Sequence, residues 1–159
     1  MTSAKMLGLG LLVAALAATG CDKKPEPTKA AQKKGDGKED DHVHGKGPNG
    51  GVVFDFGKHH AEFTVDHDKK ECTLSFLGMD EKTPTPVAAK DVTVTTKEAK
   101  AKDGTVVPPM TIKLAATDEK DGKAKTFVGT DPGLGNVAEF EGAVNGVLDA
   151  KPSKGEFKE

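Results

Sequence analysis

Five histidines lie within one window of the sequence, and the chain has no others. They are His42, His44, His59, His60 and His67, with aspartate and glutamate residues interleaved among them. Imidazole nitrogens and carboxylate oxygens are common ligands of zinc and copper ions in proteins. The window is therefore a candidate transition-metal site, although any one of these histidines taken alone is also consistent with an ordinary polar surface.

His60 and Glu62 form the fixed pair in this window. Successive side chains of a β-strand point to opposite faces, so residues two positions apart share a face. If residues 58–66 form a strand with Phe63 and Val65 turned to the core, His60 and Glu62 project together toward solvent. We expect this pair to supply the rigid part of a metal site.

The other histidines are expected to complete the ligand shell. His42 and His44 flank Val43 in an H-x-H pair, which is typical of a flexible metal-binding arm. His59 begins the expected strand, and His67 follows it in a turn. The sequence has no C-x-x-C or H-E-x-x-H pattern, so it predicts no closed zinc site.

The first residues have the features of a bacterial export signal. Lys5 precedes an apolar run, residues 6–18, that is too short as a helix to cross a hydrocarbon core of about 30 Å. Small residues stand directly before Cys21, which resembles the lipobox of bacterial lipoproteins. The resemblance implies a covalent lipid on Cys21 and a periplasmic lipoprotein anchored to a membrane of the cell envelope. The alternative is ordinary secretion with a free Cys21.

The sequence divides into three parts. Residues 1–20 are expected to be a lipoprotein signal peptide. Residues 21–47 contain the acylated cysteine and a tether rich in charge, proline and glycine, which cannot bury enough apolar surface to order its backbone. Residues 48–159 are expected to fold as one domain.

Within this domain, apolar and polar residues alternate in short segments separated by turn residues. About seven or eight such strands, without an amphipathic helix, favour an all-β, antiparallel β-sandwich of the immunoglobulin-like (Ig-like) type. A barrel is the second choice. Cys72 falls on the inward side of its strand and is expected to be a buried, inert thiol. The expected core includes Phe54, Phe63, Val65, Leu74, Phe76, Val94, Ile112 and Leu114.

Composition argues against two classes of function. All 23 basic residues are lysine and the net charge is −2. Because arginine is the favoured residue for bidentate contacts with phosphates and base edges, we expect no nucleic-acid partner. Catalysis is not expected either, because the sequence lacks a G-x-S-x-G, P-loop or dinucleotide motif and Cys72 is expected to be buried.

A short motif resembles a known family. Residues 47–51 read G-P-N-G-G, and a short strand separates them from H-A-E-F at residues 60–63. This arrangement is similar to the N-terminal β-module of periplasmic adaptor subunits from heavy-metal efflux pumps of the cobalt–zinc–cadmium type, and to small envelope lipoproteins that carry the module alone. The family motif is G-P-H-G-G, so Asn49 replaces its histidine. The resemblance covers about residues 44–78, and it implies transition-metal handling outside the cytoplasm.

Two functions follow as expectations. The first is weak binding of a zinc or copper ion by an envelope lipoprotein, as a buffer or carrier that serves metal homeostasis or an efflux system. The second is a structural or protein-interaction module of the cell envelope without a metal role. A change in the melting temperature of the domain on adding zinc or copper would distinguish the two.

Overall fold

The computed structural model describes residues 44–159, and this part of the chain is an antiparallel β-sandwich. One sheet has the strand order β1-β2-β3-β9-β8, and the other has the order β11-β10-β4-β7. The strands are β1 (Val52–Phe56), β2 (His59–Asp66), β3 (Glu71–Leu77), β4 (Ala89–Thr96), β5 (Ala99–Lys100), β6 (Val106–Val107), β7 (Thr111–Lys113), β8 (Ala115–Ala116), β9 (Thr126–Thr130), β10 (Glu141–Leu148) and β11 (Lys151–Lys158). The predicted fold class is confirmed.

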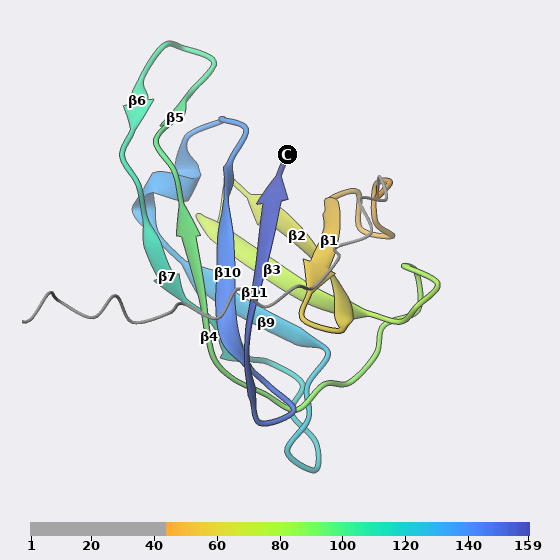
Figure 1. Ribbon diagram of the computed structural model, residues 1–159. Coiled ribbons are helices and arrows are strands. Elements are labelled where there is room, and N and C mark those ends of the chain that lie inside the picture. The colour runs from red at the N-terminus through yellow and green to blue at the C-terminus, as the bar shows by residue number, and fades with distance from the viewer. Residues whose placement is uncertain (1–43) are drawn as a thin grey trace, which may run out of the picture. The chain divides into compact units, whose positions relative to one another are not determined.

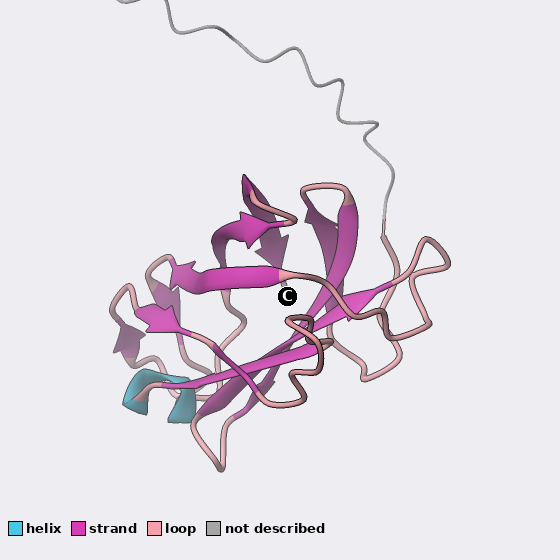
Figure 2. Ribbon diagram, turned by 90° about the horizontal axis from the view of Figure 1, so that it is seen from below, coloured by secondary structure: helices cyan, strands magenta, loops and turns pink. Residues whose placement is uncertain are grey.

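The two sheets lie face to face, with β4, β10 and β11 in front of β2, β3 and β9 in Figure 1. Strands β5 and β6 form a separate two-stranded hairpin that projects from one end. Figure 2 shows the same layers from below, together with η1 (Pro132–Gly135), a short 3₁₀ helix. The domain resembles immunoglobulin domains in having two packed antiparallel sheets. Its strand order differs from theirs, because β1, β2 and β3 here follow one another within a single sheet.

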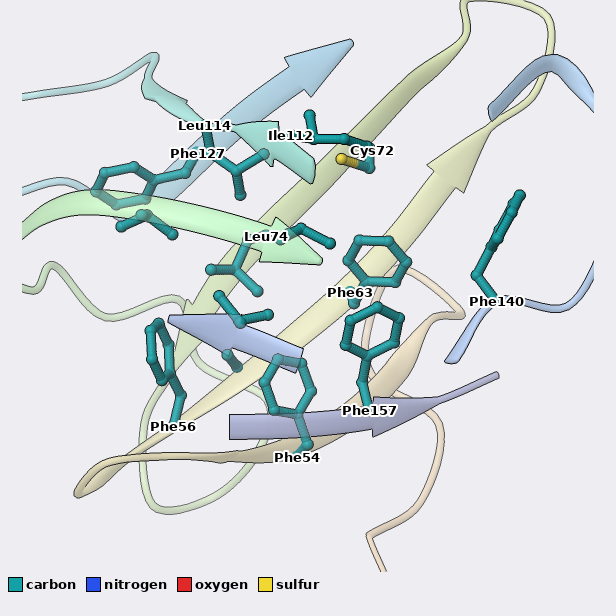
Figure 3. Close-up of a cluster of buried hydrophobic side chains, with 14 of the residues drawn as sticks. Phe54, Phe56, Phe63, Cys72, Leu74, Ile112, Leu114, Phe127, Phe140 and Phe157 are labelled. Atoms are coloured by element: carbon teal, nitrogen blue, oxygen red, sulfur yellow. The ribbon is translucent and has the colours of Figure 1, made fainter. Parts of the chain in front are cut away.

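The core forms where the inward faces of the sheets meet. Phe63 of β2 packs against Phe157 of β11 (Figure 3), and their ring centroids are 4.2 Å apart. Cys72 is fully buried, as predicted, and burial raises the pKa of its thiol to about 12. Val65 is only partly buried, unlike the rest of the predicted core. The predicted core residues that are buried are Phe54, Phe63, Leu74, Phe76, Val94, Ile112 and Leu114.

The first hairpin fixes the register of the strands that matter most below. Gly57 has a φ of 67°, in the left-handed region that glycine tolerates and that the first central residue of a type II′ turn occupies. The resulting two-residue connection pairs Phe56 with His59 and therefore Asp55 with His60. On its other edge β2 pairs with β3, so that His60 is opposite Leu77.

The folded domain begins earlier than predicted. Lys46 forms an antiparallel bridge with Val52, and the Gly47 N–H donates to the Gly51 carbonyl. Residues 44–47, which the sequence analysis assigned to the tether, are therefore part of the domain. The predicted signal peptide, Cys21 and His42 lie outside the described residues. Among residues 44–159, no helix has the length and apolar character needed to cross a membrane.

Candidate metal centre

Three separate segments meet over the outer face of the first hairpin. Strands β1 and β2 present Asp55 and His60 there as direct cross-strand neighbours. The segment before β1 brings His44, and the turn after β3 brings Glu81. We call these four residues the histidine–carboxylate group.

Three members of this group, His44, His60 and Glu81, could hold a metal ion. One ligand atom from each lies within 4.8 Å of the other two. The Glu81 Oε1 is 2.9 Å from His44 Nδ1 and 3.7 Å from His60 Nε2. A tetrahedral zinc ion with ligands at about 2.0–2.1 Å separates neighbouring donor atoms by about 3.3 Å. The observed separations therefore need only small side-chain adjustments to surround an ion.

Asp55 adds a second carboxylate between the same two rings. Its Oδ2 is 3.3 Å from His44 Nε2, and its Oδ1 is 3.4 Å from His60 Nε2. Two anionic side chains thus face two imidazoles whose ring centroids are 5.4 Å apart. Such a concentration of acceptors is stabilised by positive charge, which either protonated imidazoles or a metal cation supplies.

The backbone fixes the orientation of His60. Its Nδ1 is 3.1 Å from the carbonyl oxygen of Gly78, which accepts hydrogen bonds and cannot donate them, so Nδ1 carries the proton. In the neutral ring, Nε2 then presents its lone pair toward Asp55 and Glu81. Metal-binding histidines are commonly oriented in this way, with the distal N–H donated to a carbonyl or carboxylate.

The turn that carries Glu81 is held by its own hydrogen bonds. The Glu81 N–H donates to the Gly78 carbonyl at 3.0 Å, which closes the turn beside His60. The Asp80 carboxylate accepts from the Thr83 hydroxyl and from the N–H groups of Thr83 and Lys82. These bonds hold the pKa of Asp80 at about 2. Glu81 is therefore presented from a defined loop.

Glu62 is not exposed, and the prediction that it faces solvent is wrong. The side chain is completely buried because residues 47–51 fold over this part of β2. Its Oε1 accepts from the Asn49 and Gly51 N–H groups at 2.8 and 2.9 Å, and its Oε2 accepts from Asn49 Nδ2 at 2.7 Å. We call this arrangement the Glu62 clamp. Its hydrogen bonds leave Glu62 out of the histidine–carboxylate group.

The clamp explains the G-P-N-G-G motif in physical terms. A Cβ atom at Gly47 would lie 2.4 Å from the Glu62 Cδ, and one at Gly51 would lie 2.1 Å from the Phe63 carbonyl oxygen. Only glycine permits both close approaches. Asn49, in the middle of this motif, supplies two of the three donors to Glu62. The clamp therefore anchors the segment that carries His44.

His59 and His67 are held elsewhere. His59 Nε2 is 2.9 Å from an oxygen of Asp149, and Lys58 contacts the same oxygen at 3.0 Å. The hydrogen bonds from His59 and from Lys58 lower the pKa of Asp149. His67 Nδ1 is 2.8 Å from the carbonyl oxygen of Leu134. The structure thus brings His60 together with His44 and with neither of these two histidines.

Sequence reasoning missed Asp55 and Glu81. A signal for Asp55 was present, because a two-residue connection at Gly57 places the residue before Phe56 opposite His60. No comparable signal exists for Glu81, which is one of several acidic residues in loops. Its place depends on how the turn after β3 folds back.

The histidine–carboxylate group is open on its carboxylate side. The His44 and His60 side chains are 13% and 8% exposed, whereas those of Glu81 and Asp55 are 31% and 45% exposed. His44 also borders a cleft of about 490 Å³ whose walls include Lys46, His67 and Glu159. An ion can therefore reach the group from solvent without unfolding the domain.

Comparisons of the chain with protein-family models, with curated proteins and with solved structures found no match. The resemblance to efflux-pump adaptors therefore stays a prediction from a short motif. The functional argument depends on the geometry of His44, His60, Glu81 and Asp55.

Proposed function

We propose that this domain binds a zinc- or copper-type ion through His44, His60 and Glu81, with Asp55 as a further oxygen ligand. The observation that carries the proposal is the convergence of three ligand atoms within 4.8 Å, from segments far apart in the sequence. The orientation of His60 by the Gly78 carbonyl supports it, because that contact directs Nε2 toward the other ligands. Imidazole nitrogen with carboxylate oxygen suits zinc and cupric ions.

Binding at this site should be reversible. His44 lies in a segment outside the named strands, and both carboxylates are partly exposed. An open site with one ligand on a short loop favours exchange over permanent structural binding. We therefore propose a buffer or carrier role for the ion.

The cellular setting in this proposal comes from the sequence. The export signal and Cys21 suggest a periplasmic lipoprotein held at a membrane by covalent lipid. The resemblance of residues 44–78 suggests a metal-efflux system as the partner that receives or delivers the ion. His42, two residues before His44, could add a ligand to the same ion.

Calorimetry on residues 22–159 tests the proposal. Zinc and cupric ions are titrated at neutral pH into the unsubstituted chain, a His44→Ala/His60→Ala variant and a His59→Ala/His67→Ala control. We expect one ion per chain for the unsubstituted protein and the control. The first double variant should bind at least about 100-fold more weakly, because two of its first ligands are removed.

Equal heats for all three proteins would contradict the proposal. So would an affinity no greater than that of an unrelated protein with exposed histidines. In either case the structural or protein-interaction function takes its place.

A further inference from the structure

The cleft beside His44 collects lysine side chains from three separate parts of the chain. Lys46 lies in the segment before β1, and Lys102 lies in the loop between β5 and β6. Lys158 is the last residue of β11, whose end lies with the β5–β6 hairpin toward the top of the sandwich in Figure 1. We call this hollow of about 490 Å³ the lysine cleft.

The ammonium groups of the lysine cleft have little compensation within residues 44–159. Lys46 and Lys102 form no ion pair in this part of the chain. Lys158 has one, with Glu141 at 3.7 Å, and Glu141 forms a shorter pair with Lys97 at 2.9 Å. The three positive charges are therefore available to an anionic partner.

Two glutamates also line the lysine cleft, and they offset its charge only in part. The Glu159 Oε2 accepts from the Phe140 N–H at 3.0 Å, so this carboxylate is turned toward its own backbone. Burial raises the pKa of Glu159, which means that its surroundings disfavour the charged form. Glu139 is exposed to solvent. The walls of the cleft therefore keep an excess of positive charge.

The sequence directly before His44 has the opposite charge. Three consecutive acidic residues, Glu39, Asp40 and Asp41, end two residues short of it, and we call them the acidic run. Consecutive Cα atoms are 3.8 Å apart, so the Asp41 Cα lies within about 11 Å of the His44 Cα whichever way the chain runs. Because His44 itself lines the cleft, the acidic run is covalently held close to the three lysines.

This attachment makes weak ion pairs effective. A single pair between exposed lysine and carboxylate groups contributes little to stability. A short connection, however, gives two linked groups an effective concentration on the order of millimolar, and several pairs can form together. Residues 22–41 contain no large apolar side chain, so charge is the main attraction available between this segment and the domain.

We propose that the acidic run docks on the lysine cleft, where its carboxylates pair with Lys46, Lys102 and Lys158. The inference goes beyond the proposed function and does not depend on metal binding. His42 directly follows Asp41 in the sequence. Docking therefore holds His42 near the domain, where the proposed function needs it as a further ligand.

NMR of the nitrogen-15-labelled full chain in detergent tests the docking. The amide signals of the acidic run are compared between the unsubstituted chain and a Lys102→Gln/Lys158→Gln variant at low salt. Both substitutions are more than sixty residues away from the run along the sequence. A Lys90→Gln/Lys113→Gln variant is the matched control, since it removes two exposed lysines that lie outside the cleft.

A charge exchange makes the test specific. Asp40→Lys/Asp41→Lys should release the run and shift the amide signals of Lys102 and Lys158. Combining it with Lys102→Glu/Lys158→Glu restores attraction with the signs reversed. The combined variant should therefore regain contact between the two regions, seen as amide shifts in the run that disappear in about 0.5 M sodium chloride.

We expect the Lys102→Gln/Lys158→Gln variant to shift the amide signals of the acidic run, and the control to leave them unchanged. About 0.5 M sodium chloride should shift the signals of the unsubstituted chain in the same direction, because salt screens exposed charges. Unchanged signals in the cleft variant, or equal shifts in the control, would overturn the inference. So would a response of the cleft lysines to added phosphatidylglycerol but not to Asp40→Lys/Asp41→Lys, since the cleft would then bind anionic lipid instead. None of these outcomes bears on metal binding, which calorimetry tests separately.

Discussion

His60 and Glu62 lie two residues apart on the same face of β2, yet their surroundings are opposite in kind. The Glu62 carboxylate meets three N–H donors, from Asn49 and Gly51, and is fully buried. The His60 Nε2 instead faces carboxylate oxygens of Asp55 and Glu81. The Glu62 carboxylate is surrounded by N–H donors, whereas the His60 Nε2 is surrounded by carboxylate oxygens.

This difference shows what decides whether a residue can serve as a ligand. Residue type and strand spacing made Glu62 as good a candidate as His60. The deciding factor is whether the neighbouring groups donate or accept hydrogen bonds. Donors close the Glu62 site to a cation, whereas the acceptors beside His60 favour one. The clamp and the group nevertheless cooperate, because the clamp holds the segment that carries His44.

The largest expected effect on stability comes from truncating an inward-facing residue of β2 next to Glu62. Phe63, the residue after Glu62, is completely buried against Phe157. We expect Phe63→Ala to lower the free energy of unfolding by about 3–5 kcal/mol, the usual cost of truncating a buried phenylalanine. Urea unfolding followed by circular dichroism measures this change. A cost below about 1 kcal/mol would show that the packing of β2 against β11 is wrong.

Glu62→Gln tests the clamp directly. The glutamine oxygen can still accept from the Asn49 and Gly51 N–H groups, but its amide then places a donor against Asn49 Nδ2. We expect a loss of about 1–3 kcal/mol in unfolding free energy. Zinc affinity should fall as well, because the segment that positions His44 is loosened.

Glu156→Gln is the matched control, since Glu156 is an exposed carboxylate on β11. It should change stability by less than about 0.5 kcal/mol. If Glu62→Gln has no larger effect than this control, the Glu62 clamp does not stabilise the domain.

The smallest expected effect is the pH dependence of the turn that carries Glu81. Hydrogen bonds from Thr83 and Lys82 lower the pKa of Asp80 from 3.8 to about 2. A depressed pKa contributes stability above the unfolded value, and this contribution is lost as the pH falls through about 2. Metal binding by imidazole also depends on pH, so zinc affinity should fall in acid while the turn stays intact.

Amide chemical shifts of Lys82 and Thr83 measure this titration. They should change with a midpoint near pH 2. A midpoint near pH 4 would mean that the Asp80 carboxylate does not hold the turn.

The fold was predictable because the strands can be recognised from the alternation of apolar and polar residues along the sequence. In a two-layer sandwich, a one-residue slip turns a whole strand inside out, so the alternation at Phe54, Phe63 and Leu74 strongly constrains which side is buried. The hairpin at Gly57 also carried enough information to place Asp55 beside His60. The hypothesis that His60 belongs to a ligand group is supported in part by the geometry.

The site was less predictable because it depends on what covers the sheet. Alternation marks the polar face of β2, but it does not show whether solvent or another segment lies against that face. Residues 44–51 cover it, which buries Glu62 and brings in His44. Glu81 arrives through the turn after β3, a long-range contact that no periodicity in the sequence encodes.

Nitrogen-15 NMR of the histidine side chains of residues 22–159, with zinc added stepwise, tests the central claim most directly. Before zinc is added, His60 should carry its proton on Nδ1, as the contact with Gly78 requires. On addition of zinc, the ring nitrogens of His44 and His60 should shift together, while those of His59 and His67 stay unchanged. Shifts at His59 or His67 without any change at His60 would contradict a metal site built from His44, His60 and Glu81.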